Sequence, residues 1–139
     1  SPVLTQGALE IYLKSGMFDA HIQKMRFIYG KKAALLQQAF QDHLPPGTAC
    51  TGSLSGFYSA IELPESLKAS RLKKHLEQKN VFVEDASKMF LPEFKKDNMI
   101  RLSVSQVEEE LIDPGVQIIA ASINELMKMK NQPISFRWK

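Results

Sequence analysis

Hydrophobic residues recur with two different periods along this chain, and the period indicates which segments form helices and which form strands. The longest helical pattern begins near Phe18 and ends at a Leu-Pro-Pro-Gly turn at residues 44–47, with Asp19 at its start. Its apolar residues lie three or four positions apart, which predicts one long amphipathic helix. The stripe consists of Phe18, Ile22, Met25, Tyr29, Ala33, Leu36 and Phe40.

Short segments follow this helix. Residues 48–50 and 57–63 are predicted as two strands of a hairpin, because a loop of small residues joins them. A second helix is expected over about residues 69–79, with Leu72 and Leu76 facing inward and Asn80 as a left-handed C-cap. Residues 81–83, Val-Phe-Val, are predicted as a short buried strand, and residues 84–98 as a polar loop.

Residues 99–105 show the clearest strand pattern of the chain. Ile100, Leu102 and Val104 alternate with polar positions, of which Arg101 is the first. This period of two is typical of a strand with one buried face, so Arg101 is expected on the opposite face.

Two start signals predict terminal helices after this strand. Residues 105–108, Ser-Gln-Val-Glu, match a capping box, and Asp113 followed by Pro114 is a second N-terminal signal. A stripe with gaps of three and four residues then continues through Val116, Ile119, Ile123, Leu126 and Lys130.

Strands flanked by amphipathic helices predict an α+β fold, in which the helices cover one face of a small, mostly antiparallel sheet as a two-layer sandwich. At 139 residues, the chain is expected to form a single domain over residues 1–139. Apolar residues make up 44% and charged residues 24%, which is ordinary for a soluble globular protein. With no membrane-length apolar run and only one cysteine, Cys50, a cytoplasmic location is expected and no membrane partner.

Motifs for catalysis are mostly absent. No glycine-rich nucleotide-binding motif occurs, and the three histidines lie far apart in a chain with one cysteine, so no metal site is predicted. Cys50 with His43 is a conceivable nucleophile pair, but a packed or unreactive cysteine is the favoured interpretation. The net charge of +3 alone does not indicate nucleic acid.

Arg101 is the strongest candidate binding residue. The planar guanidinium donates two parallel hydrogen bonds to a carboxylate, and a strand holds it in a fixed direction. The alternative is that Arg101 faces water or pairs with a surface glutamate.

Three segments of the chain resemble one family. Residues 13–29, which contain His21, and residues 55–58 and 100–104 resemble the small C-terminal domain of fold-type I pyridoxal-phosphate (PLP) aminotransferases. Residues 13–29 are most similar to the aminotransferase-like half of MocR-type regulators in the GntR superfamily. The resemblance extends over about residues 6–128, although Asp85-Ala86 stands where the family often has Pro-Gly.

The resemblance implies roles for individual residues. In that family the arginine of the Ile-Arg-Leu strand binds the α-carboxylate of the amino acid, which implies this role for Arg101. Gly56, Phe57, Met89 and Phe90 are candidate cleft-lining residues. An ordinary loop glycine and packing against the hairpin are the alternative explanations.

The resemblance also implies what this chain lacks. The lysine that forms the Schiff base and most phosphate ligands would lie in a large domain upstream, and a DNA-binding winged helix further upstream still. We therefore expect no catalytic residue in this chain and no cofactor bound to it alone. The parent would bind PLP and an amino-acid effector, bind DNA through its N-terminal domain, and form a homodimer.

Three hypotheses follow. The leading one is a fragment of a MocR-type regulator in which Arg101 binds the carboxylate of the effector. The second is the small domain of a true aminotransferase without a DNA-binding domain. The third is a stand-alone α+β binding module that binds nucleic acid through Lys24, Arg26, Lys31 and Lys32, although these cations also fit a solvated helix face.

Overall fold

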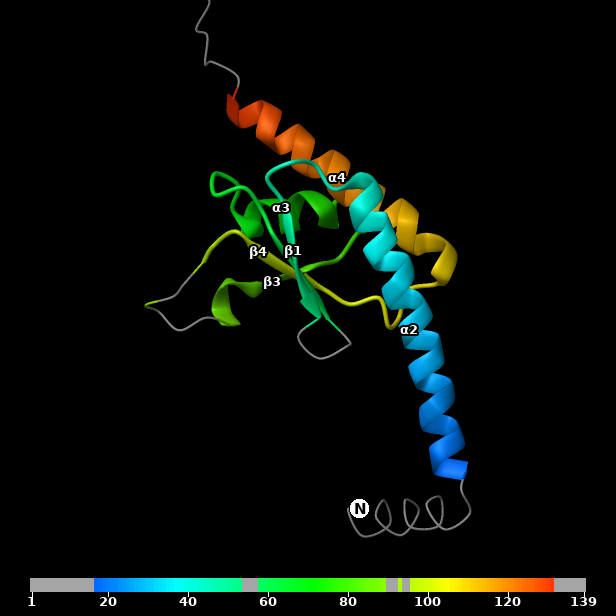
Figure 1. Cartoon of the computed structure of the whole chain (residues 1–139). Helices are drawn as coiled ribbons and strands as arrows, with labels where there is room; N and C mark the ends of the chain where they lie inside the picture. Colours follow the sequence, from blue (N-terminus) through cyan, green and yellow to red (C-terminus); the bar gives the residue numbers. More distant parts are fainter. Residues whose placement is uncertain (1–16, 54–57, 90–92, 94–95, 132–139) are drawn as a thin grey trace, which may run out of the picture.

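The structure, a computed structural model, describes residues 17–53, 58–89, 93 and 96–131 (Figure 1). Four strands in this part of the chain form one sheet in the order β1-β2-β4-β3, and every neighbouring pair is antiparallel. The strands are β1 (Ala49–Ser53), β2 (Ser59–Glu62), β3 (Glu84–Asp85) and β4 (Met99–Leu102).

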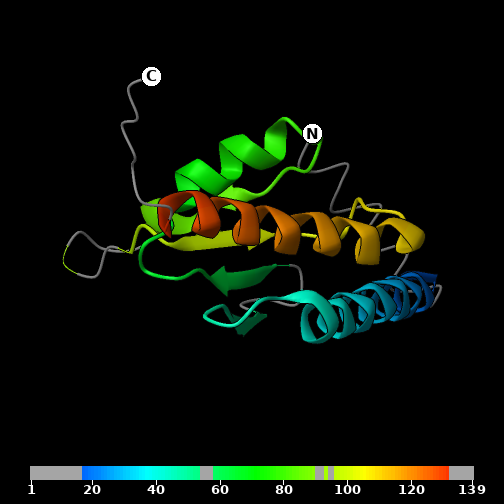
Figure 2. The ribbon, with the colours of Figure 1, turned by 90° about the horizontal axis from the view of Figure 1, so that it is seen from above.

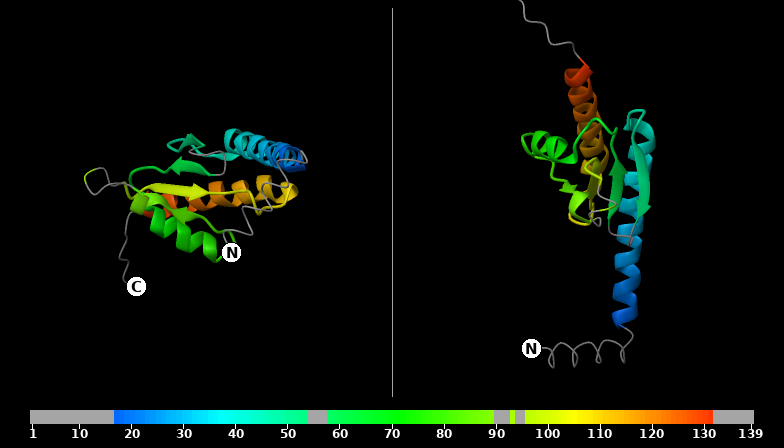
Figure 3. Two further views of the ribbon diagram at one scale, coloured as in Figure 1. Left: turned by 90° about the horizontal axis from the view of Figure 1, so that it is seen from below. Right: turned by 90° about the vertical axis from the view of Figure 1, so that its left-hand side faces the viewer.

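Within the described residues, three α-helices accompany the sheet: α2 (Met17–His43), α3 (Ala69–Glu77) and α4 (Glu109–Asn131). Opposite views show α4 lying between α2 and α3 (Figures 2 and 3). The helices share one core with one face of the sheet, to which the sheet contributes Ile61, Ile100 and Leu102. The predicted α+β sandwich with a small antiparallel sheet is therefore confirmed.

The long predicted helix is confirmed as α2, but only part of its apolar stripe is buried. Leu36 and Phe40 are 2% and 4% exposed, whereas Met25 is 37% exposed and Ile22 and Tyr29 are half-buried. The N-terminal half of α2 extends beyond the sheet and the other helices (Figure 1). Helix periodicity thus identified the element but not how much of it the core would cover.

The end of α2 follows from the local sequence. Leu44 donates its amide to Phe40, and the turn then brings the Thr48 hydroxyl to the carbonyl of Pro45 at 2.6 Å. Gly47 has a φ of +88°, which a side chain would strain. The turn leads directly into β1, so the helix and the hairpin are joined by only a few residues.

The pairing of β2 with β4 determines where Arg101 lies. Ala60 pairs with Arg101, and Ile61 pairs with Ile100. Asn98 continues this pairing beyond the strands, because its side-chain amide donates to the Leu63 carbonyl at 2.6 Å. Since neighbouring residues of a strand point to opposite faces, the burial of Ile100 and Leu102 directs Arg101 to the face away from the helices.

The predicted strand at residues 81–83 is wrong. These residues form no strand, and Phe82 is 73% exposed instead of buried. Asn80 does adopt the predicted left-handed conformation, with a φ of 60°, and the Val81 amide donates to the Leu76 carbonyl. Because the end of α3 uses the Val81 amide, strand pairing begins only at β3, within the predicted loop.

The two predicted start signals near α4 are also wrong. The helix begins at Glu109, and the hydroxyl of Ser105 bonds to Ser103 instead of capping a helix at residue 106. Pro114 lies inside α4, which continues through it without a new start. The Asp113 side chain bonds to Gln117 and His43. The strand before α4 is also shorter than predicted, because β4 ends at Leu102.

Candidate functional site

Arg101 is half-buried on the sheet face away from the three helices. The nearest acidic residue by strand pairing is Glu84, directly opposite on β3, but its carboxylate is 3.9 Å from Lys73. Within the described residues, no hydrogen bond or ion pair includes the Arg101 side chain. The alternative that Arg101 pairs with a surface glutamate is therefore not observed there.

The head group of Arg101 nevertheless has one defined neighbour. Its Cζ lies 4.4 Å from the centroid of the Tyr58 ring, which is within the range of a cation–π contact. Its Nε is buried and has no hydrogen-bond partner. An unpaired buried donor of a charged group is costly, and the described residues supply no acceptor for this nitrogen.

Small side chains surround this part of the sheet. Ala60, Ala86 and Met99 form a second buried cluster, separate from the main core. Ala86 begins a 3-10 helix, η1 (Ala86–Met89), which lies in the segment predicted as a loop and contacts β4. The Asp85 carboxylate accepts the Ser87 amide at 2.9 Å and so closes the turn into η1.

Of the predicted cleft-lining residues, only Met89 is described. It lies at the end of η1 and is 53% exposed. Gly56, Phe57 and Phe90 lie outside the described residues.

The four cations of α2 do not form one free basic face. Lys31 pairs with Glu109 at 3.1 Å, and the Lys32 ammonium donates to the Ser105 carbonyl at 3.3 Å. Lys31 therefore connects α2 to the start of α4, and Lys32 connects it to the segment before α4. Of the four cations, Lys24 and Arg26 are exposed and make no ion pair within the described residues. Two of the four cations on which the nucleic-acid hypothesis depends are thus engaged in contacts with the chain itself.

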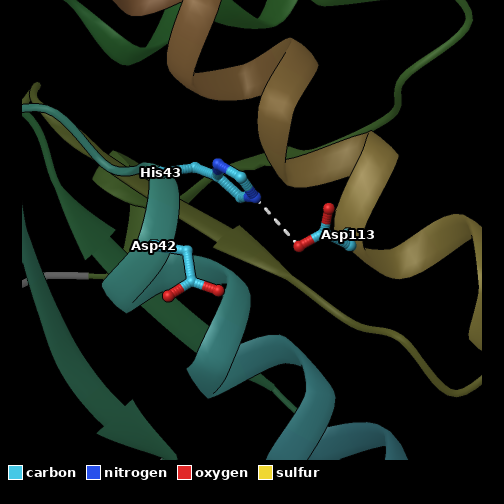
Figure 4. Close-up of side chains that lie close together, drawn as sticks. All are labelled: Asp42, His43 and Asp113. Atoms are coloured by element: carbon cyan, nitrogen blue, oxygen red, sulfur yellow. Dashed lines mark hydrogen bonds and ion pairs between the residues drawn. The ribbon is translucent and has the colours of Figure 1, made fainter.

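A histidine and two aspartates meet where α2 ends against α4 (Figure 4). Possible ligand atoms of Asp42, His43 and Asp113 all lie within 4.8 Å of one another, a grouping that the sequence did not predict. Each residue already has a protein partner: His43 bonds to Asp113 at 2.9 Å, and Asp42 accepts from Gln38. In Figure 4 the Asp42 carboxylate points away from the His43–Asp113 pair. The group serves as a contact between two helices.

A second polar contact joins α3 to α4. Glu125 accepts from Lys79 at 3.3 Å and pairs with His75 at 3.0 Å. The bond from Lys79, followed by that from His75, lowers the pKa of Glu125. The pKa of Asp113 is lowered chiefly by the bond from Gln117 and then by His43. Both carboxylates are therefore more acidic in the folded chain than in the unfolded chain.

These lowered pKa values predict acid sensitivity. A carboxylate with a lowered folded pKa stabilises the fold above its unfolded pKa, and this contribution is lost as the pH falls through the folded pKa. The double variant Asp113→Asn/Glu125→Gln should therefore lose less of its melting temperature than the unmodified chain as the pH falls below about 4. Circular dichroism from pH 6 to pH 3 measures this, with Glu77→Gln as an exposed control. Parallel declines for all three proteins would contradict the prediction.

One cavity of about 470 Å³ lies beside α4, between the end of α3 and the segment that follows β4. It lies on the other side of β4 from Arg101, since Leu102 lines it and Arg101 does not. Its walls are mostly apolar, and its one lysine, Lys79, is already bonded to Glu125. The cavity therefore lacks the free, forked donor that a carboxylate requires.

Comparison with known proteins bears on the class to which this fold belongs. No protein-family model matches the chain. The chain is 33% identical over 125 residues to the uncharacterized HTH-type transcriptional regulator YcxD of Bacillus subtilis, a match that covers 87% of this chain and 28% of that protein. Further curated relatives are named as a 2-aminoadipate transaminase and an aromatic-amino-acid aminotransferase.

Solved aminotransferases share the fold. The multiple substrate aminotransferase of Thermococcus profundus matches with a TM-score of 0.76 and 29% identity, over 85% of this chain and 29% of that one. LysN, the α-aminoadipate aminotransferase of Thermus thermophilus, solved with N-(5'-phosphopyridoxyl)-L-leucine, matches with a TM-score of 0.77 and 25% identity, over 87% and 31%. The chain thus has an aminotransferase-like fold, and the predicted resemblance is confirmed. It spans less than a third of the length of each of these proteins.

Tyr58 is the residue of the site that sequence reasoning did not select. It belongs to the 55–58 segment that carries part of the resemblance, and it lies two positions before Ala60 on the same face by alternation. The only signal in the sequence that could have identified Tyr58 was its aromatic side chain at this position. The sequence did not reveal that β2 and β4 are neighbours, which is what brings the ring to Arg101.

None of the helices among the described residues is both long enough and apolar enough to span a bilayer.

Proposed function

We propose that this chain is the aminotransferase-like C-terminal domain of a PLP-dependent, MocR-type transcriptional regulator of the GntR superfamily, and that Arg101 binds the carboxylate of an amino-acid effector. The observation that carries the proposal is the Arg101 head group, which is half-buried and has no acceptor within the described residues. A guanidinium in that state is suited to a ligand carboxylate, because its donors form a planar fork.

The regulator relative supports the choice of parent. It is the HTH-type protein, at 33% identity over most of this chain, and the chain spans 28% of its length. By that analogy, the DNA-binding segment and the PLP-binding segment of the proposed parent lie outside these 139 residues. The parent would be a cytoplasmic homodimer in which effector binding changes the closure of this domain and so biases the DNA-binding part.

The contribution of this chain would be binding and orientation. PLP, when bound by the parent, would supply an aldehyde that condenses with amino groups and a ring that withdraws electrons. Arg101 would hold the α-carboxylate of the same amino acid. Its place on β4, whose residues Ile100 and Leu102 are buried in the core, would keep the backbone of Arg101 fixed relative to the sheet.

A true aminotransferase is the second candidate. It is supported by the solved aminotransferases that share the fold at 29% and 25% identity. An Arg101 that binds a substrate carboxylate fits this candidate as well. A helix-turn-helix upstream and specific DNA binding would favour the regulator, and steady turnover of an amino acid with a keto acid would favour the enzyme. A stand-alone nucleic-acid-binding module has less support, because Lys31 and Lys32 contact α4.

Arg101 substitutions in the PLP-loaded parent test the proposal. We expect Arg101→Ala to weaken amino-acid binding by about 10- to 100-fold, since hydrogen bonds to charged groups contribute about 1.5–3 kcal/mol. Arg101→Lys should recover only part of the affinity, because an ammonium lacks the planar fork. Titration of amino acids against the PLP absorbance measures affinity. PLP content, measured separately, should stay unchanged, and unaltered amino-acid affinity in Arg101→Ala would refute the assignment.

A further inference from the structure

An aromatic ring covers the Arg101 head group. The Tyr58 centroid lies 4.4 Å from the guanidinium carbon, and the Tyr58 residue itself is 39% exposed. The strand register explains the contact. Ala60 pairs directly with Arg101, and Tyr58 lies two residues before Ala60, which makes it the diagonal neighbour on the same face.

Within the described chain, the head group makes this cation–π contact and no hydrogen bond or ion pair. Lys31, Lys73, Lys79 and Lys96 each lie within 4 Å of a carboxylate, whereas Arg101 has no such partner there. Its Nε is buried and unpaired, so no hydrogen bond fixes the plane of the guanidinium. A long, flexible side chain without hydrogen bonds would otherwise be free to change rotamer.

Stacking and carboxylate binding use different parts of a guanidinium. The Cζ atom of Arg101 lies over the Tyr58 ring, and Nε is buried. A guanidinium that stacks on a ring presents its flat face to it, which leaves the N–H groups of the two terminal nitrogens pointing outward in the plane. A glutamate in the same place would occupy the N–H groups and compete with a ligand. An aromatic ring instead restrains the orientation and leaves the donors available.

We infer that Tyr58 is a positioning residue for Arg101, holding the guanidinium by its face so that its edge receives the carboxylate of the amino acid. This inference depends on the proposed role of Arg101 as the carboxylate-binding residue. It adds a residue that acts through Arg101, and it limits the ligand to molecules that carry a carboxylate for that edge.

The test uses the PLP-loaded parent and a double-mutant cycle. Tyr58→Leu should weaken amino-acid binding roughly three- to tenfold, the size expected for a lost cation–π contact. Tyr58→Phe, which keeps the ring and removes only the hydroxyl, should bind within about twofold of the unmodified protein. In the Arg101→Ala background, Tyr58→Leu should have no further effect, because Tyr58 acts only through Arg101.

Two controls separate positioning from a general loss of structure. Binding of the corresponding amine, which lacks the carboxylate, should be equal in Tyr58→Leu and the unmodified protein, and PLP content should be unchanged. If Tyr58→Leu lowers the melting temperature, the same measurements are made on Tyr58→Gln instead. Glutamine is polar and is tolerated at a position that is 39% exposed.

The outcomes distinguish this inference from the proposed function. Losses from Tyr58→Leu and Arg101→Ala that simply add would overturn the inference, and so would a Phe variant as weak as the Leu variant. If Arg101→Ala weakens binding and Tyr58→Leu does not, only the role of Tyr58 fails. If Arg101→Ala itself leaves amino-acid affinity unchanged, the proposed function fails first.

Discussion

Replacing Phe40 with alanine is expected to lower the free energy of unfolding of this chain by about 3–5 kcal/mol. Phe40 is 4% exposed and belongs to the core shared by the helices and the sheet. Its removal takes apolar surface out of that core and leaves a cavity that the neighbouring side chains fill only in part. Urea denaturation followed by circular dichroism measures the change.

The matched control is Phe27→Ala, the same substitution on the same helix. Phe27 is 73% exposed on the half of α2 that extends beyond the sheet, so its loss should change the free energy by no more than about 0.5 kcal/mol. Equal losses for the two variants would mean that the exposed half of α2 is packed in solution. The described arrangement of α2 would then be wrong.

Replacing Ile100 with alanine should be similarly costly, at about 2–5 kcal/mol. Ile100 is fully buried, and it pairs with Ile61 on one side and Asp85 on the other, at the centre of the sheet. Ile100→Val removes one methylene group from the same position and should cost only about 0.5–1.5 kcal/mol. The same denaturation experiment compares them, and the order of the two losses is the critical result.

This second prediction also concerns the candidate site, because Ile100 precedes Arg101 on β4. The burial of Ile100 and Leu102 is what directs Arg101 to the opposite face. If Ile100→Ala were as stable as the unmodified chain, β4 would not be held by the core. The fixed orientation proposed for Arg101 would then lose its physical basis.

The parent protein is the main question for function. A regulator and aminotransferases both match this chain. What separates the two candidates is the behaviour of the intact protein, namely DNA binding or turnover. A fold alone does not determine function, since the same scaffold supports both.

Local patterns in the sequence determined most of the elements. The long helix, the hairpin, α3 with its buried Leu72 and Leu76, and the strand of Arg101 follow from periodicity and turn residues, which are properties of neighbouring positions. Local signals failed where other contacts competed with them. The Ser105 hydroxyl bonds to Ser103, so the predicted capping box does not form, and α4 continues through Pro114.

Tertiary structure alone decided the sheet order and the surroundings of the site. Arg101 could be predicted as a candidate, because the strand alternation and the family resemblance both come from residues next to it in the sequence. The ring of Tyr58 was not, since it reaches Arg101 only when β2 pairs with β4. The same holds for the His43–Asp113 contact and for the exposed half of α2. The periodicity of the sequence indicates which face of a helix or strand is apolar, but only the packing of distant segments determines what covers that face.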